Sequence, residues 1–217
     1  MKLIIWDFDG TLADTKPLIE AGMDHTLKTL GLDPKLKETW LQHVGLPIDD
    51  GVRIVFCDIG IDYNSIIRTY QNFNHIENEY LIKEFDGISE LLRELRHLRI
   101  PMAIASSKTK NPLNRQIKML GWDQYFYPIV TPSDVTAGKP NPDSVKKCLL
   151  SHNAKTEDAI VVGDTEFDLE MAQRANVASL AVCYGFQSTK SMDAYNPIAY
   201  ANNTSDLRYA LLEWSNT

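Results

Sequence analysis

Short apolar runs that alternate with amphipathic helical patterns constrain the fold of this chain more than any other feature. The runs are KLIIW, IPMAIASS, YPIVT, AIVVGD and ASLAVCYG, at residues 2–6, 100–107, 127–131, 159–164 and 178–185. Continuous apolar runs of this length are typical of strands buried on both faces. Between them lie helical patterns, such as residues 87–100, where apolar side chains recur with a spacing of about 3.6 residues. Strands that alternate with helices predict right-handed crossovers and an α/β fold with a Rossmann-like parallel sheet.

One long segment interrupts this alternation. Residues 16–83 contain helical patterns at 17–30 and 63–81 and no convincing strand. We therefore expect an α/β core domain of residues 1–15 and 84–217, with an inserted α-helical cap domain of residues 16–83. The edges of the insert, at 15–16 and 84–87, would lie close together and form a two-strand hinge. Near the other end of the chain, NNTS (202–205) is expected to supply the N-cap of a helix that contains DLRYALLEW.

Charge and composition narrow the classes of partner. The chain carries 22 basic and 29 acidic residues, a net charge of −7, and no basic run, which argues against nucleic acid and anionic membranes as partners. No stretch approaches the ~18 apolar residues of a membrane span, and no signal-peptide pattern precedes Asp7. Cys57, Cys148 and Cys183 are far apart, so we expect small core residues in a reducing cytoplasm rather than disulfides or a zinc site.

Polar residues follow the predicted strands where those strands end. Ligands of open α/β sheets bind beyond the carboxyl ends of the strands, so these residues are expected to meet at one edge. They comprise Asp7, Asp9, Gly10 and Thr11 after the first run, Ser106, Ser107 and Lys108 after the second, Lys139 in the loop after the third, and Asp164 with Asp168 after the fourth.

The charges at this edge require a cation. Asp7, Asp9, Asp164 and Asp168 are opposed by Lys139, and two like charges ~4 Å apart repel by about 4 kcal/mol at an effective dielectric of 20. An all-oxygen donor set without clustered His or Cys favours a hard ion, and Mg²⁺ suits carboxylates combined with waters and a phosphate oxygen. The sequence therefore predicts a Mg²⁺ site that also receives a phosphate group.

Four motifs in order carry a family resemblance over nearly the whole chain. DFDGT, the strand-ending serine of IASS, GKPNPD and VVGDTEFD resemble the motifs of the haloacid dehalogenase superfamily. The spacing and the early helical insert are similar to its phosphoglycolate-phosphatase-like branch with a helical cap. The resemblance implies a Mg²⁺-dependent phosphatase that acts on a small phosphorylated metabolite through an aspartyl-phosphate. Phosphoglycolate, a sugar phosphate and a nucleotide are the expected substrate classes.

The resemblance also implies roles for individual acids. Asp7 is the expected nucleophile, and Asp9 is the expected general acid and base. Asp7, Asp9 and Asp164 are the expected metal site. Asp168 is expected to support that site as a partner of its ligands rather than as a ligand.

Other positions are expected to bind the phosphoryl group or the rest of the substrate. Ser106 and Lys139 match the phosphate-binding positions of the motifs. Gly10 would let the backbone turn tightly so that N–H groups cradle phosphate oxygens. The remaining candidates are Thr11 and Ser107 for phosphate, and His43 (in HVGLP) and Arg53 for cap contacts with the substrate. The other histidines show no ligand spacing and are expected to be surface or core residues: His25, His75, His97 and His152.

Two alternative functions use similar residues. A phosphomutase of the same superfamily would use the same nucleophile and shield the phospho-aspartate from water. A phospho-accepting signalling module also combines an acidic pocket, Mg²⁺ and a lysine on a parallel sheet. Its acceptor, however, ends a strand other than the first, and such a module needs no helical insert.

Overall fold

A six-stranded sheet forms the centre of the computed structural model, which describes residues 2–74 and 76–217. All neighbouring strands are parallel, in the order β5-β4-β1-β6-β7-β8. The strands are β1 (Leu3–Trp6), β4 (Met102–Ala105), β5 (Phe126–Val130), β6 (Ala159–Gly163), β7 (Ala178–Val182) and β8 (Ala199–Ala201). The predicted α/β class with a parallel sheet is confirmed. Strand β8 was not predicted, and His75 lies outside the described residues.

Helices cover both faces of the sheet. Side chains of β1 alternate between two clusters: Ile4 and Trp6 pack with one set of helices, and Leu3 and Ile5 with the other. The first face carries α5 (Ile88–His97), α6 (Lys110–Met119) and α10 (Thr204–Ser215), and the second carries α7 (Asp143–His152) and α8 (Glu166–Arg174). The chain reverses direction across the sheet between β5 and β6, so right-handed crossovers place α5 and α6 on one face and α7 and α8 on the other. Helix α10 follows the last strand and returns to the face of α5.

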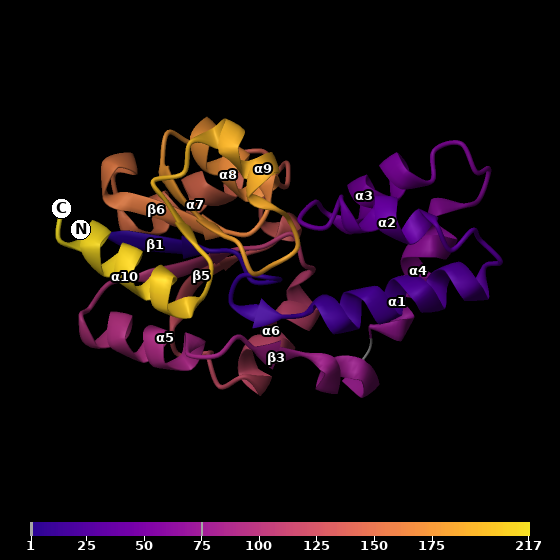
Figure 1. Cartoon of the computed structure of the whole chain (residues 1–217), viewed down its shortest axis with the longest axis horizontal. Coiled ribbons are helices and arrows are strands. Elements are labelled where there is room, and N and C mark those ends of the chain that lie inside the picture. The colour runs from indigo at the N-terminus through magenta and orange to yellow at the C-terminus, as the bar shows by residue number, and fades with distance from the viewer. Residues whose placement is uncertain (1, 75) are drawn as a thin grey trace.

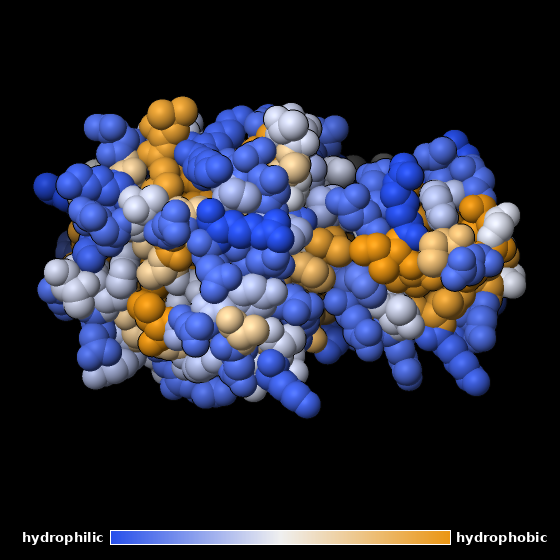
Figure 2. Space-filling model, turned by 90° about the horizontal axis from the view of Figure 1, so that it is seen from above, coloured by the Kyte–Doolittle hydropathy of each residue, from blue (hydrophilic) through white to orange (hydrophobic). Residues whose placement is uncertain are grey.

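Residues 16–83, called the helical segment below, lie at the end of the molecule away from both termini (Figure 1). Their own apolar cluster includes Met23, Trp40, Phe56 and Ile66. The helices are α1 (Lys16–Thr29), α2 (Leu36–Leu41), α3 (Ile48–Val55) and α4 (Tyr63–Phe73), followed by the 3-10 helix η1 (Ile76–Leu81). Seen from above, apolar side chains gather over this segment and along the narrow waist that joins it to the sheet (Figure 2).

A short antiparallel ribbon joins the two parts of the chain. It consists of β2 (Ala13–Asp14) and β3 (Lys83–Glu84), with Ala13 opposite Glu84. The ribbon lies at the expected hinge, and the exact domain boundaries at 15–16 and 83–84 stay a prediction. No helix among residues 2–74 and 76–217 is both long and apolar enough to cross a membrane.

Shorter elements complete the chain, and two local expectations can be compared with them. They are α9 (Thr189–Met192) and the 3-10 helices η2 (Pro132–Asp134), η3 (Thr156–Asp158) and η4 (Asp193–Tyr195). Asn203 caps α10 by accepting from the Asp206 N–H, as the NNTS segment predicts. Cys148 is buried and Cys183 is half-buried, but Cys57 is exposed, so its assignment to the core was wrong. Cys57 lies in the turn beyond the end of α3 rather than on the buried face of that helix.

Candidate active site

The parallel pairing of β1 with β6 brings two buried carboxylates together. Trp6 lies opposite Val162, and the Asp7 N–H donates to the Val162 carbonyl at 2.8 Å. Asp7 and Asp164 therefore leave adjacent strands at the same edge, with exposed fractions of 6% and 0%. Asp168, from the first turn of α8, joins them, and the three residues offer carboxylate oxygens that lie within 4.8 Å of one another.

Lys139 is the cation in contact with this cluster. Its Nζ donates to Asp168 Oδ1 at 2.5 Å and also to Asp7 Oδ1, and the residue is only 3% exposed. The other oxygen of Asp168 accepts from the N–H and hydroxyl of Thr165 at 3.1 and 2.6 Å, which forms the capping box of α8. Both oxygens of Asp168 are thus engaged in holding Lys139 and the start of α8. This geometry suits the predicted supporting role better than a ligand role.

Burial shifts the titration of these groups. It raises the pKa of Asp7 to about 7, with the charges of Asp168 and Asp9 adding to the rise and Lys139 opposing it. Burial, together with Asp7 and Asp168, raises the pKa of Asp164 well above its ordinary value. For Lys139, burial alone would lower the pKa, but the Asp168 and Asp7 carboxylates outweigh it and the net shift is upward. The cluster therefore has more negative charge than one lysine can balance.

Close backbone approach and two hydrogen bonds fix Asp164. The Thr11 hydroxyl donates to Asp164 Oδ1 at 3.0 Å, and the Phe186 N–H donates to Oδ2 at 2.7 Å. Gly10 has φ +81°, and a Cβ there would lie 2.3 Å from Asp164 Oδ2. A glycine is needed at this position for both reasons. The structure thus places Gly10 and Thr11 against Asp164, and the Thr11 hydroxyl is directed to that carboxylate.

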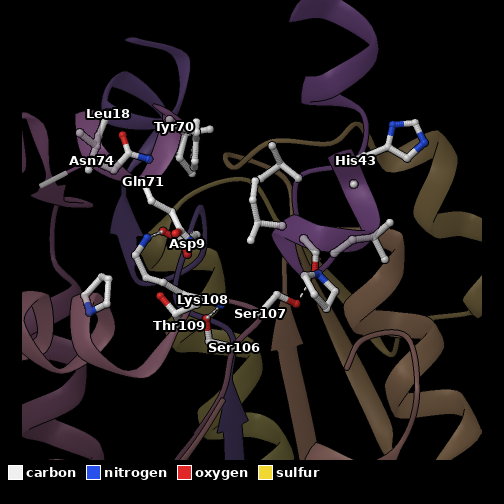
Figure 3. Close-up of a pocket in the computed structure, with 18 of the residues that line it drawn as sticks. Asp9, Leu18, His43, Tyr70, Gln71, Asn74, Ser106, Ser107, Lys108 and Thr109 are labelled. Carbon is white, nitrogen blue, oxygen red and sulfur yellow. Dashed lines mark hydrogen bonds and ion pairs between the residues drawn. The ribbon is translucent and has the colours of Figure 1, made fainter. Parts of the chain in front are cut away.

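The loop after β4 contacts both the second aspartate and the helical segment. Lys108 Nζ donates to Asp9 Oδ1 at 2.6 Å, and Ser106 Oγ accepts from the Lys108 N–H at 3.2 Å (Figure 3). Ser107 Oγ donates to the carbonyl of Gly45 at 2.6 Å, so its hydroxyl holds the helical segment. Asp9 and Lys108 are each mostly buried, with side-chain exposures of 17% and 15%.

A cavity of about 560 Å³ lies between the sheet edge and the helical segment. Its lining includes Asp7, Asp9, Ser106 and Lys108 from the sheet side. Tyr70 and Gln71 of α4, with Asn74 at its C-cap, lie together across the cavity from the Ser106 loop (Figure 3). Carboxylates and a cation therefore line a cavity of the size that small-molecule ligands occupy.

The two candidate contacts from the helical segment differ in position. His43 lines the cavity, and its Nδ1 lies 2.8 Å from the Thr39 carbonyl oxygen, which can only accept. Arg53 is exposed, and its guanidinium lies over the ring of Tyr63, 5.7 Å from the centroid. The structure therefore brings His43 to the site and leaves Arg53 outside the cavity lining.

Sequence reasoning placed Lys108 at this sheet edge but did not pair it with Asp9, and it missed other residues that shape the site. Phe186 lies in the loop after β7, at the same sheet edge, and its ring also packs against the apolar cluster of the helical segment. A search of every strand end, including that of β7, would have found it. Gln71 and Asn74 belong to no sequence motif, and helical periodicity alone does not say which polar residues face a cavity.

Comparison with known proteins places the whole chain. A family model described as haloacid dehalogenase-like hydrolase matches residues 4–182. Pyrophosphatase PpaX of Bacillus cereus (strain Q1) is 30% identical over 208 residues, which cover 95% of this chain and 94% of that protein. A predicted phosphatase from Clostridium acetobutylicum superposes with a TM-score of 0.85 at 24% identity, over 98% of each chain. A predicted phosphoglycolate phosphatase from Haemophilus somnus 129pt gives 0.84 at 18% identity, over 97% of this chain and 98% of that one.

Proposed function

This chain belongs to the haloacid dehalogenase-like hydrolases, and from that premise we propose that it is a Mg²⁺-dependent phosphatase acting on a small phosphorylated metabolite. The observation that carries the proposal is the buried group of Asp7, Asp164, Asp168 and Lys139 at the end of β1 and β6. A purely structural cluster would not need three buried carboxylates around one ammonium group, because the desolvation of unpaired charge is unfavourable.

The residues at the site fit a magnesium ion. The donors are all oxygens, they lie within 4.8 Å of one another, and the three carboxylates outnumber the one lysine that contacts them. Asp7 and Asp164 would hold the ion. The Asp9 carboxylate is engaged by Lys108, so a part for Asp9 in the metal site would fall to its main-chain oxygen. When bound, the ion neutralises negative charge on the phosphoryl oxygens.

The chain's own residues supply the chemical steps. An oxygen of Asp7 attacks phosphorus, a new P–O bond forms to the carboxylate, and the bond to the leaving oxygen breaks. Asp9, in its protonated form, gives its proton to that oxygen. It then takes a proton from the water that attacks the aspartyl-phosphate, which releases phosphate and restores Asp7 and the proton on Asp9. Acid–base help of this kind contributes ~10²–10⁴ in rate.

Substrate binding is divided between the two sides of the cavity. Ser106 and Lys139 would bind the phosphoryl group. The Gly10 N–H already donates to the Ala13 carbonyl at 2.9 Å, so it is not one of the donors. We propose that the helical segment acts as a cap, because the 42–47 loop and α4 form the wall opposite Ser106. The PpaX relative is a pyrophosphatase, which makes pyrophosphate a second candidate substrate beside the phosphate monoesters.

Hydrolysis of p-nitrophenyl phosphate tests the proposal. The purified chain should release nitrophenol with Mg²⁺ and lose this activity in excess chelator, and Asp7→Asn should abolish it. Asp123→Asn is the matched control, because Asp123 is exposed and the same chemical change there should leave turnover unaltered. Full activity in Asp7→Asn would refute the proposal. Conversion of one hexose phosphate isomer to another, without release of phosphate, would assign the phosphomutase alternative instead.

A further inference from the structure

The cavity wall contributed by the helical segment is mainly apolar. Its side chains come from α1, from α2 and the turn that follows, and from the start of α3. They include Leu18, Ile19, Met23, Trp40, Leu46 and Ile48. This wall faces the sheet edge that carries Asp9 and Ser106, so it is where the part of a substrate beyond its phosphate would lie (Figure 3).

The polar side chains on this wall are two amides, a phenol and an imidazole. Gln71 and Asn74 offer amides, and Tyr70 offers a phenol whose pKa is raised by burial, so it stays protonated at neutral pH. His43 has one ring nitrogen directed at the Thr39 carbonyl. Among the described residues that line the cavity, no lysine, arginine, aspartate or glutamate comes from the helical segment. The wall can therefore hydrogen-bond hydroxyl groups, but it offers no guanidinium or ammonium to an anion.

The lysines on the sheet side are already paired. Lys108 is bound to Asp9 at 2.6 Å, and the half-exposed Lys110 lies 3.3 Å from Asp134. Lys139 is held between Asp7 and Asp168. Lys108 and Lys139, with the ion that the acidic group would hold, serve the catalytic carboxylates and one phosphoryl group, whereas Lys110 is paired with Asp134. A second anionic group on the substrate would meet the apolar wall without a partner, which is unfavourable.

We infer that this site selects phosphate monoesters whose leaving group is uncharged and has an apolar body. Pyrophosphate, the candidate that the PpaX relative suggests, is then a poor substrate, and so are phosphorylated carboxylic acids, because their leaving groups carry charge onto the apolar wall. The inference rests on the proposed phosphatase function and gives that function a substrate class.

A matched pair of aryl phosphates tests the inference. Phenyl phosphate and 4-carboxyphenyl phosphate share their reacting bond and ring, and they differ by one carboxylate placed toward the wall. We expect kcat/KM for phenyl phosphate to be at least ~10-fold higher than for 4-carboxyphenyl phosphate. It should also be higher than kcat/KM for inorganic pyrophosphate. Equal values, or a preference for either charged compound, would overturn the inference and leave the phosphatase proposal intact. Absence of Mg²⁺-dependent turnover on all three compounds would overturn the phosphatase proposal itself.

A lysine added at the rim of the wall tests the cause of the selectivity. Gln71 is exposed and lines the cavity, so Gln71→Lys should bring the kcat/KM values of the two aryl phosphates to within ~3-fold of each other. Asn72 is exposed on the same helix and is not among the lining residues, so Asn72→Lys adds the same charge as a control and should leave the ratio unchanged. If both variants lower the ratio of kcat/KM for phenyl phosphate to kcat/KM for 4-carboxyphenyl phosphate equally, long-range charge governs the selectivity and the inference fails.

Discussion

Lys139→Met removes the charge from the centre of the acidic group while keeping a side chain of similar length. In the native protein the Lys139 ammonium is almost fully buried and donates to Asp168 at 2.5 Å and to Asp7. The variant leaves Asp7, Asp164 and Asp168 close together without a positive partner. We expect it to be inactive and, in the absence of divalent ions, much less stable than the native protein.

The size of this loss follows from the burial of the pair. Removal of one partner of a buried ion pair costs ~3–5 kcal/mol, so the free energy of unfolding at pH 8 in chelator should fall by about that amount. The loss should shrink at lower pH. Asp7 already has a pKa near 7 instead of 3.8, and removal of the lysine raises it further.

The sign of the pH effect is fixed by proton binding. Between pH 3.8 and the folded-state pKa, the Asp7 carboxyl binds more protons in the folded than in the unfolded chain. Stability therefore falls as pH rises through this window, by at most about 1.4 kcal/mol per pH unit for each such group. The pKa of Lys139 is 10.5 in the unfolded chain and is raised on folding by the Asp168 and Asp7 carboxylates, so its own contribution to stability is constant between pH 5 and pH 8.

Urea unfolding followed by tryptophan fluorescence, at pH 5 and pH 8 in chelator, measures the effect. The control is Lys155→Met, which removes an exposed lysine paired with Glu157 at 3.3 Å and should change stability by less than about 0.5 kcal/mol. A double-mutant cycle with Asp168→Asn should show coupling of at least ~1 kcal/mol at pH 8. An equal loss at both pH values, or a coupling near zero, would show that charge in this group does not control stability.

Two further predictions concern the parts that hold the site. Gly45 has φ +109°, and a Cβ there would lie 2.7 Å from Thr165 Oγ1, so Gly45→Ala should raise KM at least ~5-fold with little change in kcat. The control is Gly60→Ala, with φ +71° and open space around the residue, which should keep the native KM in the same steady-state assay. Thr11→Val removes the hydroxyl that donates to Asp164 Oδ1. In a metal titration of turnover, the Mg²⁺ concentration for half-maximal activity should rise ~10-fold, which is the low end of the loss in metal affinity expected when such a supporting contact is removed. An unchanged midpoint would contradict the role of Thr11.

The sheet could be predicted because its central strands are fully buried and carry continuous apolar runs. Strand β8 could not be predicted in the same way. It has only three residues, it lies at the edge of the sheet, and its burial alternates from Ala199 through the exposed Tyr200 to Ala201. A strand of this length has no distinct periodicity, and its pairing with β7 is decided by the helix α10 that follows and packs against it.

The acids of the site could be located because strand ends of a parallel sheet share one edge. Site residues in the helical segment were harder to predict, because no comparable rule says which of its residues meet at one place. Arg53 belongs to α3, whose buried face is formed by Gly51, Val52 and Val55, and it projects into solvent. That face could have been recognised from helical spacing. The contact of Ser107 with Gly45 could not, because it depends on how the helical segment packs onto the sheet.

Three consecutive residues of the turn after β4 contact three different parts of the site. Ser106 lines the cavity where phosphate would bind, Ser107 holds the carbonyl of Gly45, and Lys108 is paired with Asp9. The Lys108 N–H also donates to Ser106 Oγ, so these residues form one tight turn and not three independent contacts. The position of the 42–47 loop, the Ser106 hydroxyl and the environment of Asp9 are therefore connected through this one turn. Departure of the helical segment from the sheet would release the Ser107 contact and act directly on the turn that positions the lysine beside Asp9.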